Sequence, residues 1–175
     1  MKRVLNSHIS CTTKLIALLA CGAVLVPTFS GAATQTSNLS VSATVPGTCQ
    51  IGSIGTLSFG SYDFTQNKDA STTIQVTCTN GTDVNVGLGS GGGSSVTSRR
   101  MSSVTASSST LNYGLYSNSG RTQNWGETVG NDVLNYTSDG SLHTMTVYGR
   151  IPSGQPVKPA TDYSDTVQVT VTFTP

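Results

Sequence analysis

The sequence predicts an all-β fold, an immunoglobulin-like β-sandwich, from three observations. Apolar and polar residues alternate with a period of two in several short stretches, which is the pattern of half-buried strands. Gly, Pro and Asn turn signals separate these stretches. No stretch after residue 33 shows the helical period. Short strands joined by turns are typical of a sandwich built around one core.

The first alternating stretch covers residues 38–45. Its apolar face carries Leu39, Val41, Ala43 and Val45, and its other face carries Ser and Thr. Two interpretations fit this pattern. The stretch is either the first strand of the sandwich or a strand that one subunit donates to a neighbouring subunit. The choice between them decides what the protein does.

The stretch follows a predicted secretory signal peptide, residues 1–33. This segment has a basic start, an apolar run over residues 15–26 and small residues at its end. The run is shorter than the ~20 residues that a transmembrane helix needs. Cleavage after Ala32 and cleavage after Ala33 both satisfy the small-residue rule. We expect an exported chain with a donor segment at 34–47 and a domain at 48–175.

Cys49 and Cys78 are the two cysteines that remain after the signal peptide. An even pair in an exported protein predicts one disulfide, which stabilises a domain by about 3–4 kcal/mol in the chain-entropy model. Metal binding by the same thiols is the weaker alternative, because one His remains and no CxxC motif is present.

The domain then shows a series of expected strands. They cover residues 56–62, 72–78, 83–88, 111–116, 142–151 and 165–173, and a further edge segment begins at Arg99. The expected inward residues include Val84, Val86 and Leu88 in one strand and Met145, Val147 and Ile151 in another. The Gly- and Ser-rich run 89–95 predicts a mobile surface loop, and residues 117–139 form a loop region.

The strand count suggests that the sandwich is incomplete. About six strands follow the first stretch, whereas a constant-type immunoglobulin sandwich has seven. The cleanest alternation stands last and places Val167, Val169, Val171 and Phe173 on one face. An apolar strand without a neighbour would leave backbone groups unpaired. We therefore expect the missing strand to come from elsewhere.

Several motifs resemble the spore coat protein U domain family, which includes subunits of archaic, Csu-type chaperone–usher pili. They are Arg99-Arg-Met, Leu111-Asn-Tyr-Gly-Leu-Tyr, Arg121 followed by Trp125-Gly, Thr146-Val-Tyr-Gly-Arg-Ile-Pro and Tyr163-Ser-Asp-Thr-Val-Gln-Val-Thr-Val-Thr-Phe. The opening Leu-Ser-Val-Ser-Ala-Thr-Val and the segment Leu57-Ser-Phe-Gly-Ser-Tyr are similar as well. Together they cover nearly the whole chain after residue 33.

This resemblance implies an incomplete immunoglobulin-like β-sandwich that is completed by a donated strand. The implied donor side chains are Leu39, Val41, Ala43 and Val45, and the implied acceptor groove is lined in part by Val167, Val169, Val171 and Phe173. The implied partners are identical or related pilin subunits, a periplasmic chaperone and an outer-membrane usher. Ala43 is smaller than the residue expected there, so it either fits a shallow pocket or indicates a different register.

Other chemistry finds little support in the sequence. His143 is the one histidine after residue 33, no nucleophile-elbow motif is present, and the aspartates lack EF-hand spacing. We expect no catalytic residue, metal, cofactor or small-molecule substrate. Without residues 1–33 the chain has six basic and eight acidic residues and no basic stripe, which argues against nucleic acid.

Two further groups of side chains have alternative interpretations. Trp125, Tyr113, Tyr116 and Tyr136 form either an aromatic platform for a sugar or the cap of a sandwich end, and the cap is favoured. The pair Arg99-Arg100 is expected to be solvated edge charge rather than an anion site.

The leading hypothesis is a structural pilin, exported through the periplasm and assembled by donor-strand exchange into a cell-surface fibre for adhesion or biofilm formation. The alternatives are a self-contained secreted binding module and a coat protein. Deletion of residues 34–45 separates the first two, because a self-contained sandwich would lose a strand that it needs to fold.

Overall fold

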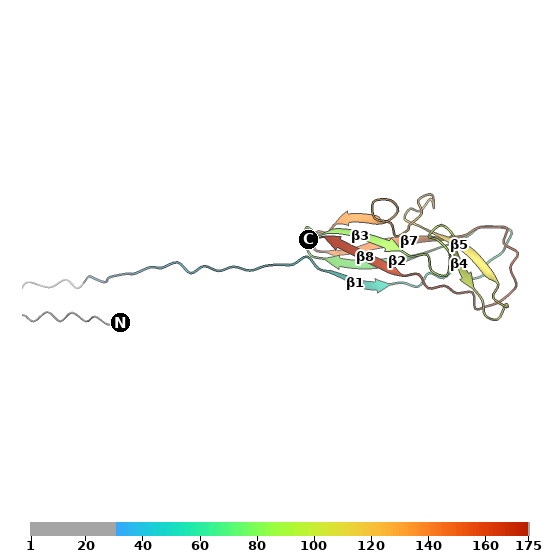
Figure 1. Cartoon of the computed structure of the whole chain (residues 1–175), viewed down its shortest axis with the longest axis horizontal. Helices are drawn as coiled ribbons and strands as arrows, with labels where there is room; N and C mark the ends of the chain where they lie inside the picture. The colour runs from blue at the N-terminus through green and yellow to red at the C-terminus, as the bar shows by residue number, and fades with distance from the viewer. Residues whose placement is uncertain (1–30, 175) are drawn as a thin grey trace, which may run out of the picture. The chain divides into compact units, whose positions relative to one another are not determined.

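The computed structural model describes residues 31–174, in which eight strands form two antiparallel sheets and no helix occurs (Figure 1). The strands are β1 (Cys49–Ile54), β2 (Lys68–Cys78), β3 (Asp83–Leu88), β4 (Arg99–Ser102), β5 (Thr110–Tyr116), β6 (Leu134–Thr137), β7 (Leu142–Ile151) and β8 (Val169–Thr174). One sheet has the order β1-β2-β7-β5-β4, and the other has the order β6-β3-β8. The predicted all-β class is confirmed.

The strands all lie within the compact unit Ala43–Pro175, and residues 31–42 belong to a separate unit without regular structure. Residues 1–30 of the predicted signal peptide lie outside the described residues. Among residues 31–174 no helix has the length and apolar character needed to span a membrane.

The core lies between the two sheets and is made of the inward residues that the alternation predicts. Val84, Val86 and Leu88 of β3 are buried, and β2 and β7 bury alternate residues in the same way. Strands β2 and β7 pair continuously from Lys68↔Ile151 to Thr77↔Leu142. This long ladder holds one face of the core in register.

The structure corrects several predicted strands. Residues 56–62 alternate in sequence but form no strand, and the last strand begins at Val169 rather than at residue 165. Strands β1 and β6 were not predicted, so the count of about six was too low. Residues 56–62 and 165–167 form no strand ladder, and both border an open side of the sandwich that is described below.

The prediction that Arg99 is a solvated edge charge is also wrong, because its side chain is fully buried. Its guanidinium donates four hydrogen bonds of 2.6–2.8 Å to backbone carbonyls and forms no ion pair with any described residue. The acceptors are the carbonyl oxygens of Leu88, Gly89, Val96 and Trp125. The neighbouring Arg100 is exposed, as predicted.

The Gly-rich run 89–95 is held by the same region. Arg99 contacts its first carbonyl, and the backbone N–H of Gly92 donates to Asp165 Oδ1 at 2.8 Å. Gly91 has a φ of 56°, and a Cβ there would lie 2.2 Å from the Asp165 carboxylate. Glycine is therefore required at this position both for the backbone conformation and for the close approach.

Candidate strand-acceptor groove

An open groove of about 1080 Å³ lies between the two sheets. One wall is the segment 54–62, which follows β1, and the other wall is the segment 157–169, which leads into β8. The floor consists of apolar core residues from both sheets: Ile74, Leu88, Leu111, Leu115, Val147 and Ile151. The groove is thus a gap along one side of the sandwich, above floor residues that are themselves buried, while apolar wall residues such as Leu57, Val167 and Val169 are only partly covered.

The opposite side of the sandwich is closed by the loop that contains Trp125. The Trp125 backbone N–H donates to Leu115 of β5, and its indole Nε1 donates to Val86 of β3, at 2.9 and 2.7 Å. Trp125 is completely buried. Trp125 therefore joins β5 of one sheet to β3 of the other.

The two groove walls adjoin edge strands, whose end residues Ile54 and Val169 also line the groove. β1 ends one sheet and β8 ends the other, and each has a single neighbour. Gly89 N–H donates to the Gln168 carbonyl at 2.9 Å, so these two opposite residues form a hydrogen-bonded pair. In an antiparallel ladder every second pair is hydrogen-bonded, so the pairs of Val169, Val171 and Phe173 are the ones without hydrogen bonds. It follows that the backbone groups of Val169, Val171 and Phe173 point away from β3, toward the free edge.

Apolar side chains beside this free edge are only partly covered. Ile51 and Ile54 pair with the buried residues Val76 and Ile74, yet they are 43% and 51% exposed. Phe173 on the opposite strand is 38% exposed. Core-facing residues on both edges therefore lack a covering neighbour, and such edges favour addition of another strand.

The predicted acceptor residues divide into two pairs. Val167 and Val169 line the groove. Val171 and Phe173 lie further along β8, opposite Val86 and Val84 of β3, and are not part of the groove lining. Sequence reasoning missed the wall at 54–62, although the alternation of Leu57 and Phe59 with Ser58 and Gly60 was a signal for it.

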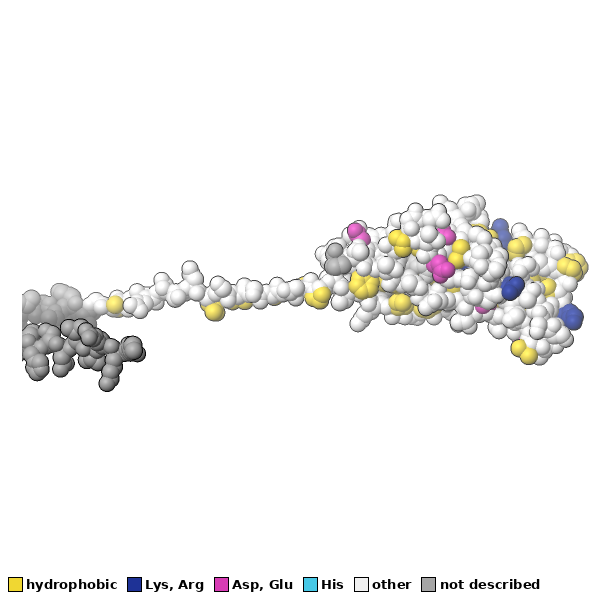
Figure 2. All heavy atoms as spheres, viewed as in Figure 1, with side chains coloured by type: hydrophobic (Ala, Val, Ile, Leu, Met, Phe, Trp, Pro, Cys, Tyr) yellow, Lys and Arg dark blue, Asp and Glu magenta, His cyan; other side chains and the backbone are white. Residues whose placement is uncertain are grey.

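The predicted donor residues lie in the segment before β1, which has no strand (Figure 1). Leu39 is 87% exposed, Val41 is 86% exposed and Val45 is 78% exposed. Figure 2 shows hydrophobic side chains along this part of the chain and no charged ones. Exposed apolar residues in a regular alternation, with no strand formed, are suited to pairing with a separate sheet edge.

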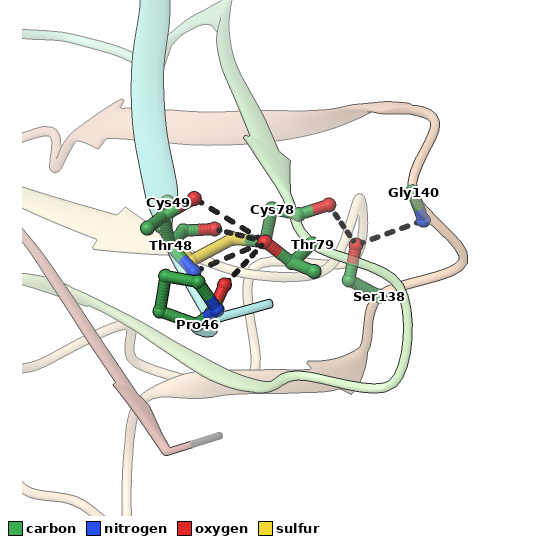
Figure 3. Close-up of a disulfide and its surroundings, with 7 residues drawn as sticks. All are labelled: Pro46, Thr48, Cys49, Cys78, Thr79, Ser138 and Gly140. Atoms are coloured by element: carbon green, nitrogen blue, oxygen red, sulfur yellow. Dashed lines mark hydrogen bonds between the residues drawn. A yellow bond between two sulfur atoms is a disulfide. The ribbon is translucent and has the colours of Figure 1, made fainter. Parts of the chain in front are cut away.

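The disulfide joins Cys49 to Cys78 across the first pair of strands, with an S–S distance of 2.05 Å. Figure 3 shows Thr79 next to it, whose Oγ1 accepts a hydrogen bond from the Thr48 N–H at 3.1 Å and donates to the Pro46 carbonyl at 3.4 Å. Ser138 Oγ donates to the Cys78 carbonyl at 3.0 Å. The start of β1 is therefore fixed covalently at the point where the preceding segment joins the domain.

The other residues singled out in the sequence do not form a site together. Trp125 and Tyr113 are buried in the core, so the four aromatic residues make no surface platform. His143 stacks on Tyr136 with ring centroids 4.0 Å apart, as a side chain of a strand end. Within residues 31–174, no three His, Cys, Asp or Glu side chains are grouped so that they could hold a metal ion.

The described domain is thus an all-β sandwich with an open groove above an apolar floor. The family model described as Spore Coat Protein U domain matches residues 35–170. The chain belongs to this family, which places it among structural proteins rather than enzymes. Protein U of Myxococcus xanthus is 36% identical over 177 residues, which cover 92% of this chain and 97% of that protein.

A solved structure shows the same fold. It is a chain in the crystal structure of the CsuC–CsuE chaperone–tip adhesion subunit pre-assembly complex from archaic chaperone-usher Csu pili of Acinetobacter baumannii. The TM-score is 0.52 at 22% identity, and the match covers 73% of this chain. The chain spans only 40% of the length of that chain, and the likeness concerns the fold alone.

Proposed function

We propose that this protein is the subunit of a surface fibre of the chaperone–usher type, assembled by donor-strand exchange. Residues 34–47 of one subunit occupy the groove of the next, and residues 48–175 form the domain that receives them. The observation that carries this proposal is the open groove between the segment that follows the edge strand β1 and the segment that leads into the edge strand β8. The family match, which includes the donor segment, supports it.

The chemistry of this assembly is strand addition to a sheet edge. The backbone of the donor hydrogen-bonds to the free edge of β8, and its alternate side chains enter the groove. Full burial of a Leu or Val side chain contributes about 1.5–3 kcal/mol. Leu39, Val41 and Val45 are almost fully exposed before assembly, so each contributes on insertion.

Partly exposed apolar side chains account for the partners that we propose. A subunit with an unfilled groove leaves wall residues such as Leu57, Val167 and Val169 only partly covered, which makes it prone to aggregation until the groove is filled. A periplasmic chaperone covers the groove after export, and an outer-membrane usher exchanges the chaperone for the next subunit. The resulting fibre lies on the cell surface and serves attachment or biofilm formation.

A coat protein is the second candidate function. The description of the family and the relationship to Protein U favour it. The same groove and donor segment would then link subunits within a coat layer. Immunogold electron microscopy of intact cells distinguishes the two, because a pilin labels thin fibres that project from the cell and a coat protein labels a continuous layer.

Supplying the missing strand within one chain tests the proposal. We expect residues 34–175, with a second copy of residues 34–47 fused after Pro175 through a flexible linker, to be a monomer that melts at least 10 °C above the unfused chain. The appended copy adds about 3 kcal/mol or more of buried apolar contacts, which corresponds to such a shift in Tm for a domain of this size. Differential scanning calorimetry and size-exclusion chromatography provide the two readouts.

A scrambled copy of the same length and composition, but without the alternation, is the control. The chain that carries this scrambled copy should oligomerise as the unfused chain does. If fused and unfused chains are equally stable monomers, residues 39–45 are an ordinary first strand, and a self-contained binding module becomes the better interpretation.

A further inference from the structure

A row of side chains crosses the floor of the groove from wall to wall. Phe59, from the first wall, contacts Tyr113 of β5 edge to face, with ring centroids 6.2 Å apart and an interplanar angle of 61°. The Tyr113 hydroxyl then donates to Oδ2 of Asp165, in the second wall, at 2.6 Å. We name Phe59, Tyr113 and Asp165 the cross-groove bar. All three residues line the groove.

The bar is fixed in place from below and from both sides. The Phe59 ring lies so close to β7 that a Cβ on Gly149 would be 2.7 Å from Phe59 Cζ. Burial, together with the hydrogen bond to Asp165, raises the pKa of Tyr113, so its hydroxyl keeps its proton and remains a donor. Asp165 also accepts a hydrogen bond from Gly92 N–H. The bar therefore has little freedom to move aside.

The floor on either side of the bar carries aliphatic side chains that are smaller than tyrosine. Leu111 and Leu115 flank Tyr113 on the same face of β5, each two residues away, which corresponds to about 7 Å along a strand. Both leucines line the groove. The groove thus offers two deep apolar positions separated by one shallow position.

The donor segment has the matching pattern of side-chain sizes. Val41 and Val45 flank Ala43 at the same two-residue spacing, and Ala43 is the smallest of the four apolar residues in the alternation. We infer that Ala43 of the inserted strand lies over the cross-groove bar and thereby sets the register of insertion. This inference rests on the proposed strand exchange. It identifies the donor residue that selects one register of insertion from several.

A double-mutant cycle in the fused chain tests this contact. The appended copy carries Ala43→Leu, and the groove is either native or carries Phe59→Leu. In the native groove we expect Ala43→Leu to lower Tm by about 5–10 °C, because the added side chain overpacks against a fixed bar. With Phe59→Leu in the groove, the same change should cost less than half as much, because the smaller side chain leaves room.

Val41→Leu in the appended copy is the matched control, since it enlarges a residue placed over a deep position. It should change Tm by no more than about 3 °C. If the leucine of the Phe59→Leu variant still fills the space above Gly149, the Phe59→Ala variant is used in its place. An equal loss for Ala43→Leu in both grooves, or no loss in either, would overturn the inferred register. If the native copy itself gives no stabilisation, the proposed strand exchange has failed instead.

Discussion

Replacing Arg99 with lysine is expected to destabilise the domain by about 3–5 kcal/mol. The guanidinium satisfies four backbone carbonyls at once, and three of its hydrogen bonds are buried, those to Leu88, Gly89 and Trp125. A lysine ammonium has three donors and no planar fork, so it leaves carbonyls unsatisfied and remains a buried charge. Such a loss is a large share of the 5–15 kcal/mol that stabilises a typical domain.

Urea unfolding of the purified Arg99→Lys variant, followed by tryptophan fluorescence, measures this effect. The single tryptophan, Trp125, is itself one of the partners of Arg99, so its fluorescence reports directly on the region. Arg100→Lys is the matched control, because Arg100 is exposed and should change stability by less than about 0.5 kcal/mol. Equal stability of the Arg99 and Arg100 variants would show that the buried network contributes little.

Replacing Val41 with aspartate is expected to abolish assembly while leaving the domain folded. Val41 lies in the segment before β1 and is 86% exposed, so the change removes no contact within the domain core. Inside an apolar groove, however, an unpaired carboxylate costs at least about 3 kcal/mol, which corresponds to a 100-fold or greater loss of affinity.

Analytical ultracentrifugation and negative-stain electron microscopy of residues 34–175 measure this loss of assembly. Ser42→Asp is the matched control, because residue 42 alternates to the opposite face of the donor strand and remains in solvent. We expect that variant to assemble as the native chain does. Assembly of Val41→Asp at the native rate would mean that the apolar face of residues 38–45 does not enter a groove.

Alternation in the sequence was sufficient to predict the strands that have neighbours on both sides. β3 and β7 each pair with two strands, and their inward residues were predicted correctly from the period of two. The stretch 56–62 shows the same pattern but forms no strand, because the groove leaves it without a partner. A period of two indicates which side chains can be buried on one face, whereas a strand also needs a neighbouring strand for its backbone hydrogen bonds.

The buried polar groups and short strands were beyond the reach of the sequence pattern. Arg99 follows a Ser- and Gly-rich run and reads as a surface charge, and only the converging carbonyls around it reveal its role. β6 has four residues within a Gly- and Asn-rich region, which hid it. The cross-groove bar joins residues 59, 113 and 165, and no local pattern connects positions so far apart.

The most direct test of strand exchange is a disulfide trap between subunits. Val41→Cys places a thiol on the donor face, and Val167→Cys places one in a groove wall, while Cys49 and Cys78 are already paired. We predict that oxidation of the assembled double variant gives a covalent ladder of dimers, trimers and higher species on a non-reducing gel, and that Ser42→Cys with Val167→Cys gives none. A cross-link confined to single chains would contradict strand exchange and identify residues 38–45 as a strand of their own domain.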